Sequence, residues 1–325
     1  MKKITLSIFL VIAFSSISLG CDVCNIYEYT NLNNRSFIGF FYRYRTFNGY
    51  AHLGNEHQFQ FPTNGRTSHE PEENGLYADK TQQDYETYTT WELRGNITLK
   101  EKINFQFILP YEQNTVYYKK IIALPKPETD TTIALEGWGD LMLAADYIFQ
   151  KSNGKIKHIF RPGFAINFPT GDYKKASEEG KLYDPIIQPG TGSWAWIIRA
   201  NYQVIYRNTG LMASLNYQIA GKGKHNYDFA NSFNFNADVF HQLFLGNLAI
   251  VPRMGTYMEN ASHDFFQNEK VALSGGNSWF GNIATDFNFK KWTCQIAYQI
   301  PFSESLNGNQ LGNAGRFNFG IIKGF

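Results

Sequence analysis

The sequence predicts an all-β protein, an antiparallel transmembrane β-barrel of about 12 strands with short periplasmic turns and longer extracellular loops. Composition is the first reason. The 325 residues include 28 Phe, 20 Tyr and 6 Trp, only 18% are charged, and the mean hydropathy is −0.36. The second reason is that apolar and polar residues alternate over long stretches, as in strands with one lipid-facing side and one wet side. No run of about 18 apolar residues follows residue 20, which excludes helical membrane spans.

The first twenty residues have the features of a signal peptide. Lys2 and Lys3 precede an apolar stretch from Ile4 to Ile17, and small residues end at Gly20, where cleavage is expected. We therefore expect export through the inner membrane and a final location in the outer membrane of a Gram-negative cell. The net charge of +2 gives no sign of a nucleic-acid partner.

The expected domains are a signal peptide (1–20), a periplasmic N-terminal segment (21–34) and an outer-membrane barrel (35–325). The N-terminal segment begins with Cys21 and also contains Cys24. An alternative is a lipoprotein, because a cysteine directly after Gly20 is where a lipid-attachment motif ends, although Ser18 stands where Leu is preferred. In that case acylation of Cys21 would anchor the N-terminus in a leaflet.

Twelve segments have strand character, and the connections between them alternate in length. The predicted strands are 35–47, 85–99, 103–117, 139–150, 156–170, 193–206, 211–221, 227–243, 248–259, 279–289, 292–302 and 316–325. Every second connection is a short turn, and Asn153-Gly154 is a strong hairpin signal. The others are mostly longer and cover 48–83, 118–133, 171–191, 222–226, 260–277 and 303–314. This alternation is typical of an even-stranded barrel with both termini in the periplasm.

The alternation also assigns the faces of each strand. Ile103 and Phe105 lie on one face of their strand, with Asn104 and Gln106 on the other, and the same period places Tyr227 and Phe229 on the lipid side. The charged residues that this phase directs into the lumen are Arg43, Arg45, Glu86, Glu92, Arg94, Asp140, Asp146, Arg161, Arg199, Asp238, Arg253 and Asp286. One interpretation is that they pair across neighbouring strands and fill the lumen. The other is that they form a constriction that selects a polar or charged solute.

Several motifs resemble a known family. Gly137-Trp138-Gly139-Asp140 and the later Asn167-Phe168-Pro169-Thr170-Gly171-Asp172-Tyr173 are followed by Gln188-Pro189-Gly190-Thr191-Gly192-Ser193, and Ile108-Leu109-Pro110-Tyr111 precedes them. Together they resemble the phenol meta-pathway type of outer-membrane transporter-like β-barrels, over about residues 84–245. The resemblance implies passage of small molecules, hydrophobic ones included, across the outer membrane. A further resemblance, to Bacteroidetes-type barrels, lies in the Cys-Asp-x-Cys motif at Cys21-Asp22-Val23-Cys24.

The motifs also have a plain structural interpretation, in which they shape turns. Pro169 would end the ladder of its strand, and Gly171 would supply a positive φ. We therefore expect both motifs to have a structural role, with direct contact to a solute as the alternative.

The cysteines and histidines leave alternatives open. Cys21 and Cys24 are candidates for a disulfide in an oxidising periplasm, but they also supply half of a metal site, and Cys294 is expected on the lipid side. His52, His57 and nearby carboxylates fall in the first long loop, which we interpret as a solvated polar loop, with divalent-metal capture as the alternative. No cofactor is expected.

The function expected from these features is an outer-membrane channel or transporter for passive or facilitated passage of small solutes, such as hydrophobic or aromatic compounds or metal ions. The alternative is a barrel with a plugged lumen that serves as a binding or structural protein. Catalysis is not expected, since the chain has no Gly-x-Ser-x-Gly motif and no assignable Ser–His–acid grouping. The expected partners are the lipid bilayer, a small-molecule solute, and the barrel-assembly machinery, which would recognise the last strand through its terminal Phe325.

Overall fold

The computed structural model describes residues 35–50, 84–120, 129–308 and 310–325. The strands are β1 (Phe37–Tyr50), β2 (Tyr85–Leu99), β3 (Ile103–Lys120), β4 (Thr129–Trp138), β5 (Leu141–Tyr147), β6 (Phe149–Asn153), β7 (Ile156–Phe168), β8 (Ala195–Tyr206), β9 (Thr209–Ala220), β10 (Tyr227–Asp228), β11 (Ser232–His241), β12 (Leu243–Leu245), β13 (Leu248–Ala261), β14 (Phe265–Phe266), β15 (Glu269–Lys270), β16 (Gly276–Phe289), β17 (Trp292–Leu306) and β18 (Leu311–Gly324). Within these ranges no helix is long and apolar enough to cross a membrane.

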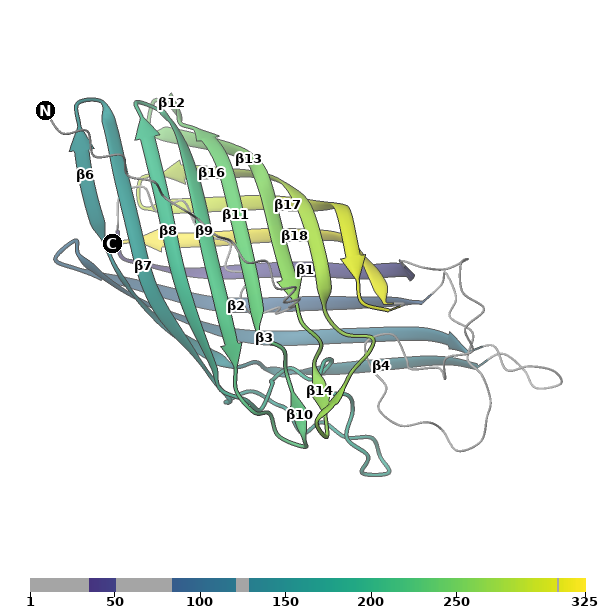
Figure 1. Ribbon diagram of the computed structural model, residues 1–325. Coiled ribbons are helices and arrows are strands. Elements are labelled where there is room, and N and C mark those ends of the chain that lie inside the picture. Colours follow the sequence, from purple (N-terminus) through teal and green to yellow (C-terminus); the bar gives the residue numbers. More distant parts are fainter. Residues whose placement is uncertain (1–34, 51–83, 121–128, 309) are drawn as a thin grey trace, which may run out of the picture.

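The strands form one closed antiparallel sheet, which confirms the predicted fold class (Figure 1). Around the wall the order is β11, β9, β8, β7, β5, β3, β2, β1, β18, β17, β16 and β13, and β13 pairs with β11 to close the barrel. β4 and β6 share the position of β5 in the wall, where β4 pairs with β3 and β6 pairs with β7. In the same way, β12 shares the position of β11 and pairs with β13. Counted in this way, the wall has the 12 strands that the sequence predicts.

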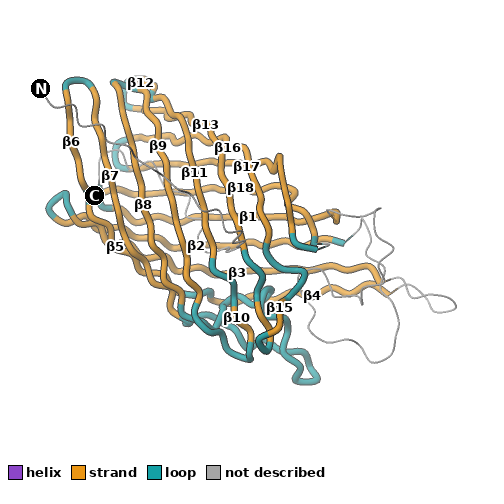
Figure 2. Tube along the Cα trace, viewed as in Figure 1, coloured by secondary structure: helices purple, strands orange, loops and turns teal. Residues whose placement is uncertain are grey.

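The two ends of the barrel differ in the length of their connections. At the short-turn end, which also holds the C-terminus, the chain reverses at residues 100–102, 154–155, 207–208, 246–247 and 290–291 (Figure 2). Positive φ angles at Lys100, Glu101, Arg207 and Lys290 show that these tight reversals need left-handed backbone. At the opposite end, called the loop end here, the described loops cover 169–194, 221–231 and 262–275, and β10, β14 and β15 form a small separate sheet there.

Alternate side chains along each strand point outward and inward, and the outward ones are apolar while the inward ones are polar, the reverse of a soluble protein. Large apolar side chains such as Phe40, Phe105 and Ile198 are exposed on the outside of the wall, while arginines, carboxylates and amides are buried inside. Soluble proteins rarely expose apolar patches larger than a few hundred Å². An apolar outer surface around a polar interior is therefore the arrangement of a barrel that crosses a lipid bilayer.

Some expectations about strand limits and facing were wrong. The last strand begins at Leu311, five residues before the predicted start at 316. The fourth wall strand begins at Thr129, ten residues before the predicted start, because β4 pairs with residues 111–120 of β3 beyond the expected loop boundary. Tyr227 and Phe229 do not face lipid. The strand predicted over 227–243 is interrupted after Asp228, and Tyr227 is buried with its hydroxyl bonded to Asp264 Oδ2 at 2.6 Å.

Candidate functional site inside the barrel

All the charged residues that were expected on the inner face are buried. Most of them contact a side chain of opposite charge or a neutral hydrogen-bonding group. Glu92 lies between two guanidinium groups: Arg43 Nε is 2.7 Å from Oε1, and Arg94 Nε donates to Oε2 at 2.6 Å. Further ion pairs join Arg199 Nε to Asp146 Oδ1 at 3.1 Å and Arg253 Nη2 to Asp286 Oδ1 at 3.4 Å. Pairing of this kind is what allows charges to remain ionised away from bulk water.

Other members of the set are held by neutral groups. Glu86 accepts hydrogen bonds from the hydroxyls of Tyr88, at 2.8 Å, and Tyr118, at 2.9 Å. The Arg45 guanidinium lies 5.1 Å from the centre of the Tyr88 ring, within the range of a cation–π contact. Asp238 accepts from the Asn236 and Asn282 amides at 2.9 and 3.2 Å, while Arg161 is buried on β7.

Some of these contacts pass over intervening strands of the inner face instead of joining neighbouring strands. Asp146 on β5 and Arg199 on β8 are separated in the wall by β7. Arg199 Nη1 also donates to Gln106 Oε1 on β3, at 3.1 Å. Side chains from separate parts of the wall therefore meet inside the barrel and narrow it.

Asp140 joins the three glycine-rich motifs of the sequence into one cluster. Its Oδ1 accepts from the backbone N–H of Gly171 at 2.9 Å, and its Oδ2 accepts from the N–H and the hydroxyl of Thr191 at 2.9 and 2.5 Å. Next to it, Asp172 N–H donates to the Trp138 carbonyl at 2.8 Å. A single buried carboxylate therefore fixes the start and the end of the long 169–194 loop.

The glycines of this cluster are needed because backbones approach one another closely. A Cβ on Gly171 would lie 2.7 Å from the carbonyl carbon of Gly139, and a Cβ on Gly190 would lie 2.5 Å from that of Gly171. The expectation of a positive φ at Gly171 was wrong, since the positive angles in this loop are at Gly180 and Gly192. Close contact between chain segments is the second reason why a position requires glycine.

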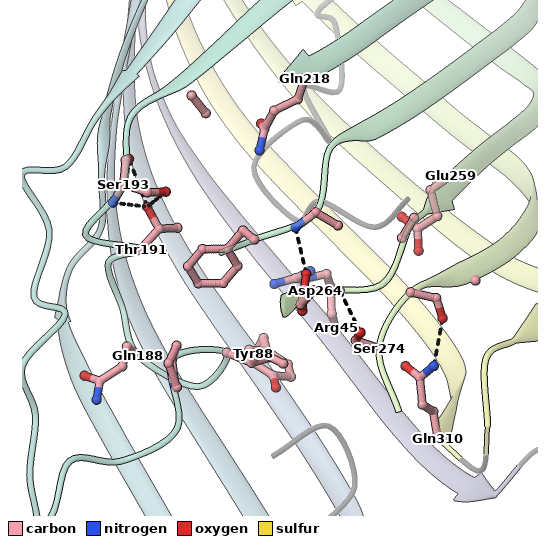
Figure 3. A pocket seen from close by; sticks show the side chains of 18 of the residues that line it. Arg45, Tyr88, Gln188, Thr191, Ser193, Gln218, Glu259, Asp264, Ser274 and Gln310 are labelled. Atoms are coloured by element: carbon pink, nitrogen blue, oxygen red, sulfur yellow. Dashed lines mark hydrogen bonds between the residues drawn. The ribbon is translucent and has the colours of Figure 1, made fainter. Parts of the chain in front are cut away.

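A cavity opens inside the barrel at the loop end, and we call it the loop-end cavity (Figure 3). About 140 Å³ of it is available to the centres of water molecules. In Figure 3, Thr191, Ser193 and Gln188 lie on one side, Glu259, Ser274 and Gln310 lie on the other, and Arg45 and Asp264 lie between them. Tyr88, Phe229, Ile186 and Leu306 add apolar surface, so the cavity has both hydrogen-bonding and hydrophobic walls.

Asn167 of the second motif lines this cavity. The residue is only 2% exposed, and among the described residues its side-chain Oδ1 has no hydrogen-bond donor. A buried amide oxygen without a donor is rare and costs free energy. It is therefore an unsatisfied acceptor behind the surface of the cavity wall.

A smaller cavity lies next to the loop-end cavity, further along the barrel wall, and we call it the mid-barrel cavity. Its walls include Arg43, Glu92, Arg94 and Asp140. It shares three lining residues, Glu112, Pro189 and Thr191, with the loop-end cavity. We call these three shared residues the neck.

The segment 183–189 of the long loop lies across the barrel interior at the loop end. Ile187 is buried in an apolar cluster with Phe47, Tyr88 and Val116, and its carbonyl accepts from Asn114 Nδ2 on β3 at 3.1 Å. Gln188 Nε2 donates to the carbonyls of Lys175 and Tyr183 at 2.9 and 3.0 Å. The segment is thus held by side chains of the wall as well as by its own loop.

Asp184, in the same segment, has a carboxyl group with a raised pKa. Burial raises the pKa of its carboxyl to about 7, and the charges of Asp264 and Glu86 contribute to that rise. A hydrogen bond from the Ile186 N–H to Oδ1, at 2.9 Å, opposes it only in part. The loop end therefore contains a carboxyl group that changes charge near neutral pH.

Sequence reasoning missed several residues of the cavity walls. Glu112 shares the inner face of its strand with Asn104 and Gln106 but was not proposed as a site residue. Glu259, Asp264 and Asp184 were not proposed because they lie at strand ends or in loops, where the period of two does not assign a face. For Glu259, the signal that could have been used is its position at the end of a predicted strand, where the alternation continues onto the inner face.

Some expectations concern residues outside the described part of the chain. These include the signal peptide, Cys21, Cys24 and the histidines of the first long loop. Cys294 is half-buried between the inward Thr293 and Gln295, on the outer side of β17. Among the described residues, no group of three or more His, Cys, Asp or Glu side chains is arranged to hold a metal ion.

The fold is shared with a solved outer-membrane protein, and other barrels are less similar. An outer-membrane channel from Pseudomonas putida F1 aligns over 90% of this chain and 96% of its own, with a TM-score of 0.58 and 14% identity. The β domain of the Bordetella autotransporter BrkA and a Pseudomonas aeruginosa FadL homologue align over 90% of this chain, and over 99% and 90% of theirs, with TM-scores of 0.42 and 0.36 and 10% identity each. No family model matches the sequence, and no curated protein matches it.

The fold and the surface together define the class. The chain is a 12-stranded transmembrane β-barrel of the outer-membrane type, with an apolar belt outside and paired charges inside. Within that class, the likeness to the Pseudomonas putida channel covers nearly the whole of both chains.

Proposed function

We propose that this protein is an outer-membrane channel for the passive or facilitated passage of small solutes. The observation that carries the proposal is the shared lining of the two cavities. Glu112, Pro189 and Thr191 contribute to both, so a solute in the loop-end cavity is already in contact with the walls of the next cavity. This neck leads from the external loops toward the Arg43–Glu92–Arg94 cluster.

The walls of the loop-end cavity are suited to solutes that have both apolar and polar groups. Tyr88 and Phe229 offer ring surfaces, Glu259 offers carboxylate acceptors, and Ser193 and Thr191 offer hydroxyls. Pockets that bind small molecules combine apolar surface with a few placed polar groups in the same way. We therefore infer that the preferred solutes are small, partly apolar molecules that carry hydrogen-bond donors, such as single aromatic rings with hydroxyl groups.

The test is single-channel conductance of the refolded full chain in a planar bilayer. We expect discrete current steps that are reduced by millimolar catechol but not by glucose. Glu112→Gln removes a negative charge from the neck, so it should lower the preference for cations over anions. Glu136→Gln is the matched control, because Glu136 is exposed on the outside of the neighbouring strand β4. Equal selectivity in both variants would contradict the proposed path.

A second candidate function follows from the contacts that pass over intervening strands inside the barrel. The Arg199–Asp146 pair and the Arg199–Gln106 hydrogen bond link β8 to β5 and β3, and they support a barrel filled by its own side chains. Such a protein would bind a ligand at the loop end without conducting it. A folded, inserted barrel that gives no current but binds catechol would favour this candidate over a channel.

A further inference from the structure

The short-turn end of the barrel has a strong excess of positive charge. Eight of its exposed basic side chains lie in or beside four of the five turns and in the last strand: Lys100, Lys102, Lys151, Lys155, Arg207, Lys290, Lys291 and Lys323. Among the described residues within three positions of those turns, Glu101 is the one carboxylate. We call these eight side chains the basic rim.

The loop end does not share this excess. Its described loops, 169–194, 221–231 and 262–275, contain six lysines and seven Asp or Glu residues. The whole chain carries a net charge of only +2. The asymmetry is therefore a property of one end of the barrel and does not follow from overall composition.

The basic rim lies beside lipid-facing aromatic residues. The cationic groups of Arg207, Lys290 and Lys323 lie 5.4, 5.3 and 5.4 Å from the ring centres of Tyr206, Phe289 and Trp292. All three rings are exposed on the outside of the wall. Exposed aromatic residues at strand ends mark the depth of the lipid headgroups. The charges next to them are thus placed at the level of the phosphates.

We propose that the basic rim binds the phosphate groups of anionic phospholipids in the leaflet that surrounds the short-turn end. Each amine or guanidinium is an exposed donor that matches a phosphate oxygen, and the neighbouring ring packs against the upper acyl chain. Basic residues at a membrane surface attract anionic lipids, by about 1 kcal/mol each, or about fivefold in affinity. The proposal goes beyond solute passage and does not depend on whether the barrel conducts.

The probe is native mass spectrometry of the full chain in detergent, with phosphatidylglycerol or phosphatidylcholine of the same chain length added. We expect more bound phosphatidylglycerol than phosphatidylcholine, and a preference that falls in high-ammonium buffer. The test variant carries R207Q, K290Q, K291Q and K323Q. The control carries K174Q, K222Q, K224Q and K270Q, which removes the same charge from the loop end. We expect the test variant to lose the preference by about tenfold or more and the control to keep it.

Two results would overturn the proposal. One is a wild-type protein that binds both lipids equally. The other is a test variant that retains the preference while the control loses it. Heat-dependent mobility on gels reports whether each variant is folded. If the four-site variant fails to fold, the pair K290Q and K291Q, which lies in a single exposed turn, is measured in its place.

Discussion

Arg316 on β18 and Glu259 on β13 form a two-point ion pair across the interior of the barrel. Arg316 Nη1 lies 2.8 Å from Glu259 Oε2, and Nη2 contacts the other carboxylate oxygen. β16 and β17 lie between these strands in the wall. The Arg316 guanidinium also stacks 4.1 Å from the centre of the Phe280 ring. Because Glu259 lines the loop-end cavity, the pair forms part of its wall.

Glu259→Gln should destabilise the barrel by roughly 3 kcal/mol, since it leaves the buried Arg316 without its counter-ion. The double variant Glu259→Gln with Arg316→Gln should recover part of that loss, because it buries no unpaired charge. The measurement is urea unfolding of the refolded protein in detergent, followed by tryptophan fluorescence. If the two single changes and the double change were simply additive, the pair would contribute no coupling energy.

Gly190→Ala should destabilise the protein by roughly 1–3 kcal/mol. The added Cβ would lie 2.5 Å from backbone atoms of Gly171, which cannot rotate away as a side chain can. Gly281→Ala, on β16, is the matched control, because a Cβ there meets no atom within 4 Å. The measurement is the midpoint of urea unfolding of each variant. Equal midpoints would show that the Asp140 cluster accommodates the added Cβ without loss of stability.

The stability of the loop end should depend on pH through Asp184. The carboxyl of an unfolded chain has a pKa near 3.9, whereas that of Asp184 in the folded protein is about 7. The folded state therefore binds an extra proton between these values. Its stability falls as pH rises from about 4 to about 7 and is level above that.

Asp184→Asn keeps the acceptor for the Ile186 N–H but removes the charge. The variant should therefore gain stability relative to wild type as pH rises from about 4 to about 7. The free energies of unfolding of both proteins, measured across this range, give the difference. Glu178→Gln, at an exposed carboxylate of the same loop, serves as the control. A difference that does not change with pH would contradict the assignment.

Phe325→Ala should lower the amount of barrel in the outer membrane and leave chain in the periplasm, if the terminal aromatic residue is the recognition element for assembly. Its side chain is 64% exposed, so the change removes little packing, and its N–H donates to the Ser36 carbonyl at 3.0 Å in either variant. Phe302→Ala on β17 is the control, with the same 64% exposure. Membrane fractionation gives the readout, and equal levels for both variants would remove the proposed role.

The sequence by itself determined the class of fold, because period-two alternation is a local property of each strand. Alternation around Phe105 and Gln106 was enough to separate the outer face from the inner face. The short turns likewise follow from adjacent residues, as at Asn153-Gly154, where the glycine adopts a φ of 59°.

Only the tertiary structure decided which inner residues meet. Arg199 contacts Asp146 and Gln106, and Arg316 contacts Glu259, because strand number, tilt and stagger set the curvature of the wall. The same holds for the segment around Ile187, whose position depends on Asp140 joining residues that are 31 and 51 positions away in the chain. Contacts of this kind join distant parts of the chain, so no local pattern contains them, and the two cavities are formed by such contacts.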